Sequence, residues 1–127
     1  MTDTPDTATD TDTATVLRRY ARAFLEHEPS LLDALVAPDC VVERAQPAEG
    51  RTHLVGREAC LANWRALAAN RAGTFTIEEL LALGEHGLVF WHYRFGPGAA
   101  DAQRGLNVFV VRDGLIASGR GYVKAAA

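Results

Sequence analysis

The stretch VVRDGLI at residues 110–116 places a tight turn between two apolar runs. Asp113 and Gly114 tolerate the positive φ angles that a two-residue hairpin turn requires. Residues 106–112 and 115–124 are therefore expected to form two antiparallel strands that meet at this dipeptide.

The same pattern extends toward the N-terminus from this hairpin. Residues 88–95 and 74–83 are further apolar runs between Gly-rich or charged turns. Residues 77–81 alone would also suit a helix. Taken together, the four runs predict an antiparallel meander in the C-terminal half of the chain.

The N-terminal half shows helical spacing instead. Thr13 can cap a helix over residues 14–28, in which apolar side chains recur every three or four positions, and Pro29 ends it. Ser30 can cap a second short helix over residues 31–36. Pro38 ends this helix, because proline disfavours helical backbone in the residue before it.

A strand and a third helix complete this half. Residues 40–46 are expected to form the strand, residues 47–56 a polar loop, and residues 57–70 a helix. Helices gathered in the first half and strands in the second indicate an α+β domain.

Charge divides the chain into a tail and a domain. Residues 1–13 consist almost entirely of Thr, Asp and Ala, with four aspartates and no large apolar side chain, so they are expected to form a disordered acidic tail. The single domain then spans residues 14–127. This domain is nearly neutral. A chain of 127 residues leaves no room for a second domain.

Several classes of partner are excluded by composition. No basic stripe appears in the sequence, so neither nucleic acid nor an anionic membrane is an expected partner. No residue spacing fits a metal site or a phosphate loop, so neither a metal nor another cofactor is expected. Cys40 and Cys60 are interpreted as buried, reduced thiols, which fits a cytoplasmic protein without an export signal. Small molecules and protein partners remain.

Four local strings carry a resemblance to a known family: LRRYARAF at residues 17–24, VAPDCVVE at 36–43, VGREA at 55–59 and VVRDGLI at 110–116. Together with the order of elements they resemble the SnoaL-like group of the nuclear transport factor two-like superfamily. That group includes polyketide cyclases and is similar to ketosteroid isomerases and limonene epoxide hydrolases. The resemblance implies a cone-shaped, curved antiparallel sheet packed against about three helices and enclosing a pocket.

The direction of the side chains in residues 88–95 decides what lines this pocket, because alternate residues of a strand point to opposite faces. Periodicity alone would bury the face that carries Val89, Trp91, Tyr93 and Phe95. The resemblance implies the reverse, with the pocket face carrying Phe90, His92 and Arg94. The aromatic face would then cover the outside of the cone and form a homodimer interface.

The resemblance also assigns single positions. Tyr20 matches the first-helix tyrosine that donates a hydrogen bond to the substrate oxygen in ketosteroid isomerases. Arg44 and Asn107 stand where those isomerases carry aspartates, and Gly121 stands where cyclases and epoxide hydrolases carry theirs. The three acidic anchors of the known mechanisms are thus absent.

The remaining polar groups suggest a proton-transfer site rich in hydrogen-bond donors. His92 is expected to transfer the proton, while Arg94, Asn107 and Tyr20 hold the oxygen on which negative charge develops. Further substrate contacts are expected from Arg44, Trp64, Phe90 and Phe109. Each of these polar groups also has a plain structural reading, as a core hydroxyl, a surface ion pair or a strand residue on the outer face.

Two functions from different classes follow. The first is a cofactor-independent isomerase, cyclase or dehydratase that acts by proton transfer on a cyclic or polyketide-like substrate. The alternative is a non-catalytic pocket or dimerisation module that binds a hydrophobic carboxylate or carbonyl compound. A His92 side chain outside the cone would favour the alternative.

Overall fold

The computed structural model describes residues 5–45 and 53–124, and it describes side chains from Asp12 onward. The elements in chain order are α1 (Pro5–Leu25), the 3-10 helix η1 (Pro29–Leu32), β1 (Val36–Glu43), β2 (His53–Val55), α2 (Arg57–Ala69), β3 (Thr74–Leu83), β4 (His86–Arg94), β5 (Ala102–Arg112) and β6 (Leu115–Val123).

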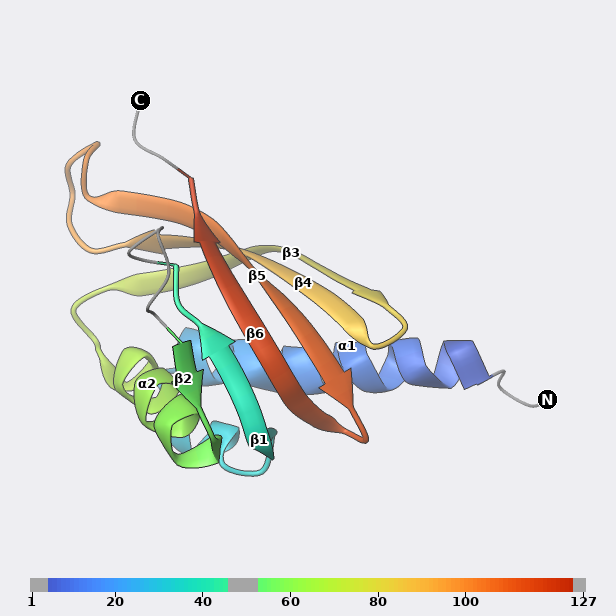
Figure 1. Cartoon of the computed structure of the whole chain (residues 1–127). Helices are drawn as coiled ribbons and strands as arrows, with labels where there is room; N and C mark the ends of the chain where they lie inside the picture. The colour runs from blue at the N-terminus through green and yellow to red at the C-terminus, as the bar shows by residue number, and fades with distance from the viewer. Residues whose placement is uncertain (1–4, 46–52, 125–127) are drawn as a thin grey trace.

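Six strands form one curved sheet in the order β2-β1-β6-β5-β4-β3, and α1 and α2 lie along one side of it (Figure 1). The strands β3 to β6 form the expected antiparallel meander. The sheet as a whole is mixed, because β1 pairs with β6 in parallel. The α+β class is confirmed, with two α-helices and one short 3-10 helix in place of three helices.

The hairpin between β5 and β6 forms at the dipeptide that predicted it. Asp113 has a φ of 55° and Gly114 a φ of 76°. The flanking pairs Val111–Ile116 and Arg112–Leu115 leave these two residues alone in the turn. Positive φ at both central residues gives the turn the twist of the strands that it joins.

Helix α1 starts earlier than expected, at Pro5 and not at Ala14, so Thr13 is no N-cap. Thr13 lies inside the helix, is 1% exposed, and donates a hydrogen bond of 2.6 Å from Oγ1 to the carbonyl of Gly84 in the β3–β4 turn. The tertiary contact holds this part of α1 although its sequence has low helix propensity. Residues 1–4 lie outside the described residues, and there the disorder expected of the tail stays a prediction.

Residues 31–36 do not form the expected short helix. The chain turns through η1 and enters β1 at Val36, which pairs with Ile116 of β6. Pro38 lies within β1, where the pairing with β6 is irregular between Val36 and Val41. A proline lacks the N–H that a regular ladder needs, so it is tolerated at this irregularity.

A further short strand, β2, lies inside the stretch predicted as the loop 47–56 and pairs with β1. Residues 46–52 of that loop are outside the described part. The helix expected over residues 57–70 is α2 and ends one residue earlier.

The core lies between the helices and the concave face of the sheet. Leu17 of α1, Phe109 of β5 and Ile116 of β6 are fully buried there. Cys40 and Cys60 are free and buried, as predicted. Within the described residues, no helix has the length and apolar character needed to span a membrane.

Candidate functional site

A cavity of about 470 Å³ opens between the concave face of the sheet and the two helices. This volume suits a small organic molecule. Seven aromatic side chains line it: Tyr20, Phe24, Trp64, Phe75, Trp91, Tyr93 and Phe109. They come from α1, α2, β3, β4 and β5, so the site exists only when the helices close over the sheet.

Three of these rings form the inner wall. The Tyr20 ring packs edge-on against Phe109, with centroids 4.8 Å apart, and against Trp64 at 5.3 Å. Phe109 is fully buried and Trp64 is 4% exposed. Their interlocked edges hold the Tyr20 ring in one orientation, and its hydroxyl therefore has a fixed position in the cavity.

Gly105 determines where the Trp91 indole lies. Trp91 of β4 and Gly105 of β5 are direct cross-strand partners, and a Cβ on Gly105 would collide with the six-membered ring of the indole. Because glycine leaves this space empty, the indole lies across β5. Its Nε1 reaches the side chain of Asn107, two residues further along the same face of β5.

A chain of hydrogen bonds crosses the floor of the cavity. Trp91 Nε1 donates to Asn107 Oδ1 at 3.2 Å, and Asn107 Nδ2 donates to Tyr20 Oη at 3.3 Å. An indole N–H can only donate, so the group that faces it must be the amide oxygen. This requirement fixes the orientation of the Asn107 carboxamide.

The direction of this chain leaves the Tyr20 proton available. Tyr20 Oη accepts from Asn107, and no described residue accepts a hydrogen bond from the hydroxyl. Burial raises the pKa of Tyr20 well above its ordinary value, which the hydrogen bond from Asn107 offsets only in part. The hydroxyl therefore stays protonated and can donate to a ligand in the cavity.

Gly121 of β6 lets the chain after β1 and the Asn107 side chain approach β6 closely. A Cβ on Gly121 would lie 3.3 Å from Asn107 Oδ1 and 3.2 Å from the backbone nitrogen of Ala45. The Asn107 carboxamide and the chain just after β1 thus flank the same small space. Arg44 and Ala45 both line the cavity.

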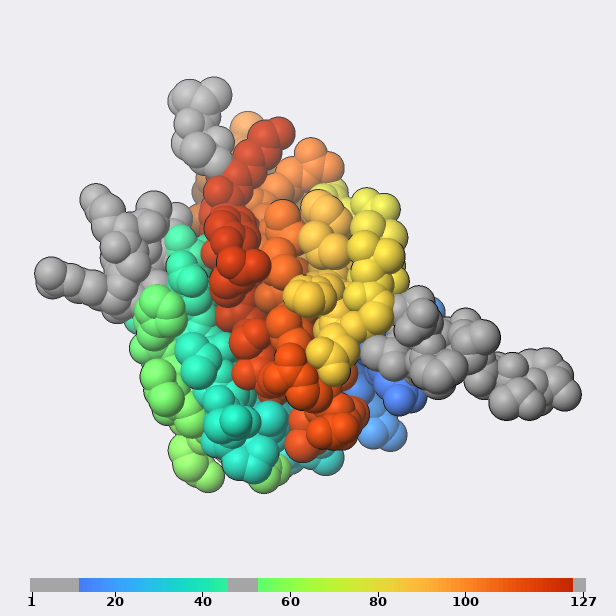
Figure 2. All heavy atoms as spheres, turned by 45° about the vertical axis from the view of Figure 1, so that its right-hand side comes forward, coloured from blue at the N-terminus to red at the C-terminus, as the bar shows by residue number. Residues whose placement is uncertain are grey.

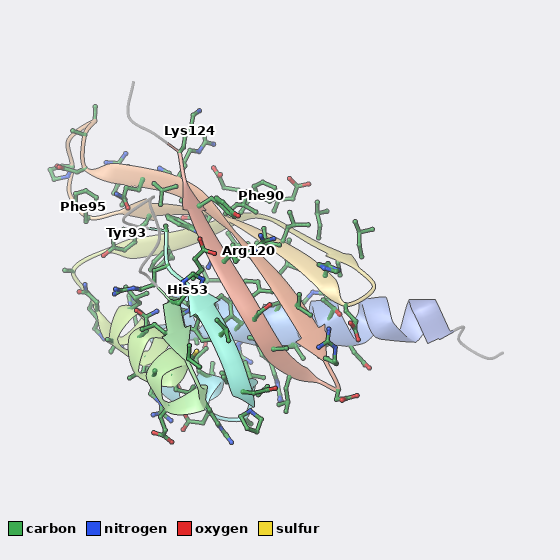
Figure 3. All side chains as sticks on the ribbon, viewed as in Figure 1. His53, Phe90, Tyr93, Phe95, Arg120 and Lys124 are labelled. Atoms are coloured by element: carbon green, nitrogen blue, oxygen red, sulfur yellow. The ribbon has the colours of Figure 1, made fainter. Side chains whose placement is uncertain are left out.

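Charged groups gather where β1 ends. The carboxylate of Glu43 lies 3.7 Å from His53 Nε2 on the neighbouring strand β2. Arg44 lines the cavity, and among the described residues no carboxylate lies within 4.0 Å of its guanidinium. Figure 3 shows His53 at this end of the sheet, with Tyr93 and Phe95 from the end of β4.

The structure reverses the expected orientation of β4. Val89, Trp91 and Tyr93 line the cavity, whereas His92, Arg94 and Phe90 do not. Figure 3 shows Phe90 on the side of the sheet away from the helices and Tyr93 on the side that faces them.

Partners on the outer face account for the charged side chains of β4. Arg94 Nη1 donates to the carbonyls of Gly96 and Gly98 in the β4–β5 turn. His92 is the cross-strand partner of Arg104, which forms an ion pair of 2.6 Å with Glu78. The Arg94 guanidinium is thus satisfied by local carbonyls and needs no ligand anion.

Five of the eight predicted site residues line the cavity: Tyr20, Arg44, Trp64, Asn107 and Phe109. The prediction for His92, Arg94 and Phe90 is wrong in orientation, and so is the outer-face interface expected from Trp91, Tyr93 and Phe95. Trp91 and Tyr93 are cavity residues that the site prediction left out. The apolar alternation of residues 88–95 does identify them, since it favours burial of their face.

Comparisons with known proteins agree with this architecture. The model of the SnoaL-like domain family matches residues 17–119. An NTF2-like protein of unknown function from Mesorhizobium loti is 32% identical, with 98% of each chain covered and a TM-score of 0.85. No curated protein matches the sequence.

Two more distant structures share the fold. A candidate ketosteroid isomerase from Kribbella flavida is 21% identical, with 93% of this chain and 82% of that chain covered and a TM-score of 0.78. An LEH-like epoxide hydrolase from M. tuberculosis is 19% identical, with 91% and 80% covered and a TM-score of 0.71. At these identities the likeness concerns the fold.

Proposed function

We propose, from the premise that this chain belongs to the SnoaL-like domain family, that its cavity binds a small, largely apolar cyclic molecule and holds one oxygen of it. The Tyr20 hydroxyl and the Asn107 carboxamide are the two groups that hold this oxygen. The observation that carries the proposal is the hydrogen-bond chain from Trp91 through Asn107 to Tyr20, which ends in a buried donor without an acceptor.

The energetics support a ligand at this place. A buried hydroxyl donor without a partner costs free energy, and a carbonyl oxygen from a ligand would remove that cost. The aromatic side chains of the cavity supply apolar contact to the ligand, and the two donors orient it. This is the pattern of a binding pocket in which few polar groups select among many apolar molecules.

Tyr20→Phe tests the proposal because it deletes one hydroxyl and keeps the ring that packs on Phe109 and Trp64. We expect the dissociation constant for a probe ketone, 2-acetonaphthone, to rise by roughly threefold to tenfold, as for one lost hydrogen bond. Isothermal titration calorimetry measures it. The matched control is His92→Gln on the outer face, which should leave the affinity unchanged.

Two results would contradict this assignment. Equal ketone affinity in Tyr20→Phe and the original protein would remove the hydroxyl from the binding site. A loss of affinity in His92→Gln as large as that in Tyr20→Phe would show that the ligand lies on the other face of β4.

A catalytic function remains a second candidate, because two donors aimed at one oxygen also stabilise an enolate. An isomerase, cyclase or dehydratase of this kind needs a group that takes up a proton. Glu43 is the one carboxylate among the described residues that line the cavity, and it lies beside His53. His92, which faces away from the cavity, is no longer a candidate for this role.

Proton exchange tests catalysis separately from binding. Turnover would appear as deuterium incorporation next to the carbonyl of bound 2-acetonaphthone in D₂O, followed by NMR. Loss of this exchange in Glu43→Gln with unchanged ketone affinity would support an enzyme. No exchange above the buffer rate with any bound ketone would leave the pocket as a binding module.

We also propose a homodimer through the outer face of the sheet, with residues other than Trp91, Tyr93 and Phe95 at the interface. Figure 2 shows β1, β6, β5, β4 and β3 side by side across this face. It exposes Leu81, Leu83 and Tyr122 by 43%, 70% and 48%, and Phe90 lies among them. Exposed apolar side chains on one face of a sheet are what a second copy of the chain would cover.

Sedimentation velocity tests the dimer with a matched pair of substitutions. Leu83→Glu places a charge on the outer face, and Leu25→Glu places one at the end of α1, where leucine is 44% exposed. Only the first should shift a dimer to monomer. A monomer in the unmodified protein at tens of micromolar would refute the proposal.

A cytoplasmic location stays part of the proposal. It is based on Cys40 of β1 and Cys60 of α2, two elements that pack directly against each other. Both cysteines are nevertheless free thiols in the core. Reduced thiols persist in the cytoplasm. Fractionation of cells that express the full chain tests this, and recovery of the protein outside the cytoplasm would contradict it.

A further inference from the structure

Gly73, in the loop between α2 and β3, has no room for a side chain because the Tyr93 ring occupies that place. A Cβ on Gly73 would collide with Cζ and Oη of Tyr93. Gly73 is buried and does not have a positive φ, so its backbone conformation would accept other residues. The position of the Tyr93 ring therefore requires glycine here, and the backbone does not.

The Tyr93 side chain connects the two layers that enclose the cavity. Its backbone belongs to β4 in the sheet, and its hydroxyl end meets Gly73 in the loop that follows α2. Figure 3 shows Tyr93 on the side of the sheet that faces the helices. Tyr93 lines the cavity, whereas Gly73 does not. The ring thus separates Gly73 from a bound ligand, and Gly73 would act on that ligand through the ring.

Two further rings restrict where Tyr93 can move. The centroid of the Phe75 ring on β3 lies 4.4 Å from that of Tyr93, and the centroid of Phe95, just after β4, lies at 5.8 Å. The remaining neighbours on the same face are Trp91 and the cross-strand partner Gln103, and both line the cavity. A displaced Tyr93 ring would therefore move toward the cavity, where space is available.

We infer that Gly73 is a positioning residue of the binding site, and that the space which it preserves selects ligands with fused rings over ligands with one ring. This inference rests on the proposed binding function and adds the ligand's size to it. With Tyr93 against Gly73, the cavity of about 470 Å³ is large enough for fused rings beside the oxygen that Tyr20 and Asn107 hold. A side chain at position 73 would move the Tyr93 ring inward and leave room only for a smaller molecule.

Gly73→Ala tests this inference with two ketones, 2-acetonaphthone with two fused rings and acetophenone with one ring. We expect the dissociation constant of 2-acetonaphthone to rise about tenfold and that of acetophenone to change less than about twofold, because only the larger ketone needs the space that the ring would enter. Isothermal titration calorimetry measures both constants. Ala72→Ser is the matched control, since it adds one heavy atom to the same loop at an exposed position outside the cavity lining. It should change neither constant.

A double-mutant cycle tests whether Gly73 acts through Tyr93. The ring is absent in Tyr93→Ala, so adding Gly73→Ala to that variant should change the affinity for 2-acetonaphthone by less than about twofold. Tyr93→Ala by itself gives a test that does not depend on how Gly73→Ala folds. Its larger cavity should raise the affinity for the three-ring ketone 2-acetylanthracene, relative to 2-acetonaphthone, by about fivefold or more. A thermal melt of each variant without ligand verifies that the fold is intact.

The outcomes separate the inference from the function on which it rests. Unchanged 2-acetonaphthone affinity in Gly73→Ala, or an equal loss for both ketones, overturns the inference. A loss that persists in the Tyr93→Ala background overturns the action through the ring. If Gly73→Ala does not fold, an unchanged preference between 2-acetylanthracene and 2-acetonaphthone in Tyr93→Ala overturns the inference instead.

Ketone binding that depends on Tyr20 leaves the proposed function standing in each of these cases. Absence of 2-acetonaphthone binding to the unmodified protein overturns the function and the inference together.

Discussion

The two faces of β4 differ sharply although their residues alternate along a single strand. The concave face presents Val89, Trp91 and Tyr93 to the cavity, and its one strong polar contact is the hydrogen bond from Trp91 to Asn107. The outer face carries His92 and Arg94, whose neighbours are turn carbonyls and the Glu78–Arg104 ion pair.

This difference shows why charge alone is a poor guide to a binding site. Histidine and arginine are the residues of β4 with the richest chemistry, yet neither lines the cavity, and Arg94 donates to local carbonyls instead. The ligand-facing side is aromatic, and its polar groups act through fixed hydrogen-bond directions. A one-residue shift in register exchanges the two faces completely.

The largest expected effect compares two phenylalanines on opposite faces of the sheet. Phe109 is fully buried against Tyr20 and Trp64, and Phe90 lies on the outer face. Phe109→Ala should lower the free energy of unfolding by about 3–5 kcal/mol. Phe90→Ala should lower the free energy of unfolding by less than half as much. Urea titrations at low protein concentration, where the chains do not associate, measure both values. Equal losses would mean that both faces are core.

Alkaline pH should reveal the buried hydroxyl and thiol of the concave side. Burial raises the pKa of Tyr20 above its ordinary value of 10.0, and burial with the neighbouring Cys60 raises the pKa of Cys40 from 9.0 to about 12. Both groups ionise more easily in the unfolded chain. The stability that they contribute is therefore complete below pH 9 and is lost as the pH rises through the window from 9 to 12.

Urea titrations between pH 8 and pH 11 measure this loss, which cannot exceed about 1.4 kcal/mol per pH unit for each group. Tyr20→Phe and Cys40→Ala should each make the decline shallower. Tyr122→Phe, at a tyrosine exposed on the outer face, is the matched control. An unchanged slope in both of the first two variants would contradict the burial that the structure assigns.

The smallest expected effect concerns the N-terminal part of α1, which closes the concave side near the β3–β4 turn. A chain that starts at Asp12 retains the hydrogen bond from Thr13 to the Gly84 carbonyl, and one that starts at Ala14 loses it. We expect the first truncation to keep its melting temperature. The second should lose about 1 kcal/mol of stability. A fall in the first would show that residues before Asp12 pack on the domain.

Local chemistry determined much of the fold from the sequence alone. Asp113-Gly114 fixed the β5–β6 hairpin because few other dipeptides accept positive φ twice. Thr74–Leu83 was placed to the residue, and the helix spacing of residues 57–70 located α2 within one residue. Such features depend on neighbours in the chain and need no distant partner.

Tertiary contacts decided what the sequence left open. Pro38 forbids a helix nearby, but only the irregular pairing with β6 makes its surroundings a strand. The position of Thr13 inside α1 likewise brings its hydroxyl to the Gly84 carbonyl, 71 residues away.

The orientation of β4 separates the two kinds of information most clearly. Alternation in the sequence defined its two faces, and the apolar bias of Val89, Trp91 and Tyr93 favoured their burial. The positions implied by the resemblance to distant relatives predicted that the opposite face lines the cavity. That prediction was wrong by one residue. Which face lines the cavity depends on where α1 and α2 cross the sheet, and Gly105 and Gly121 then determine which polar atoms can meet there. Local sequence patterns cannot predict which face lines the cavity, because packing between elements that lie far apart in the chain determines it.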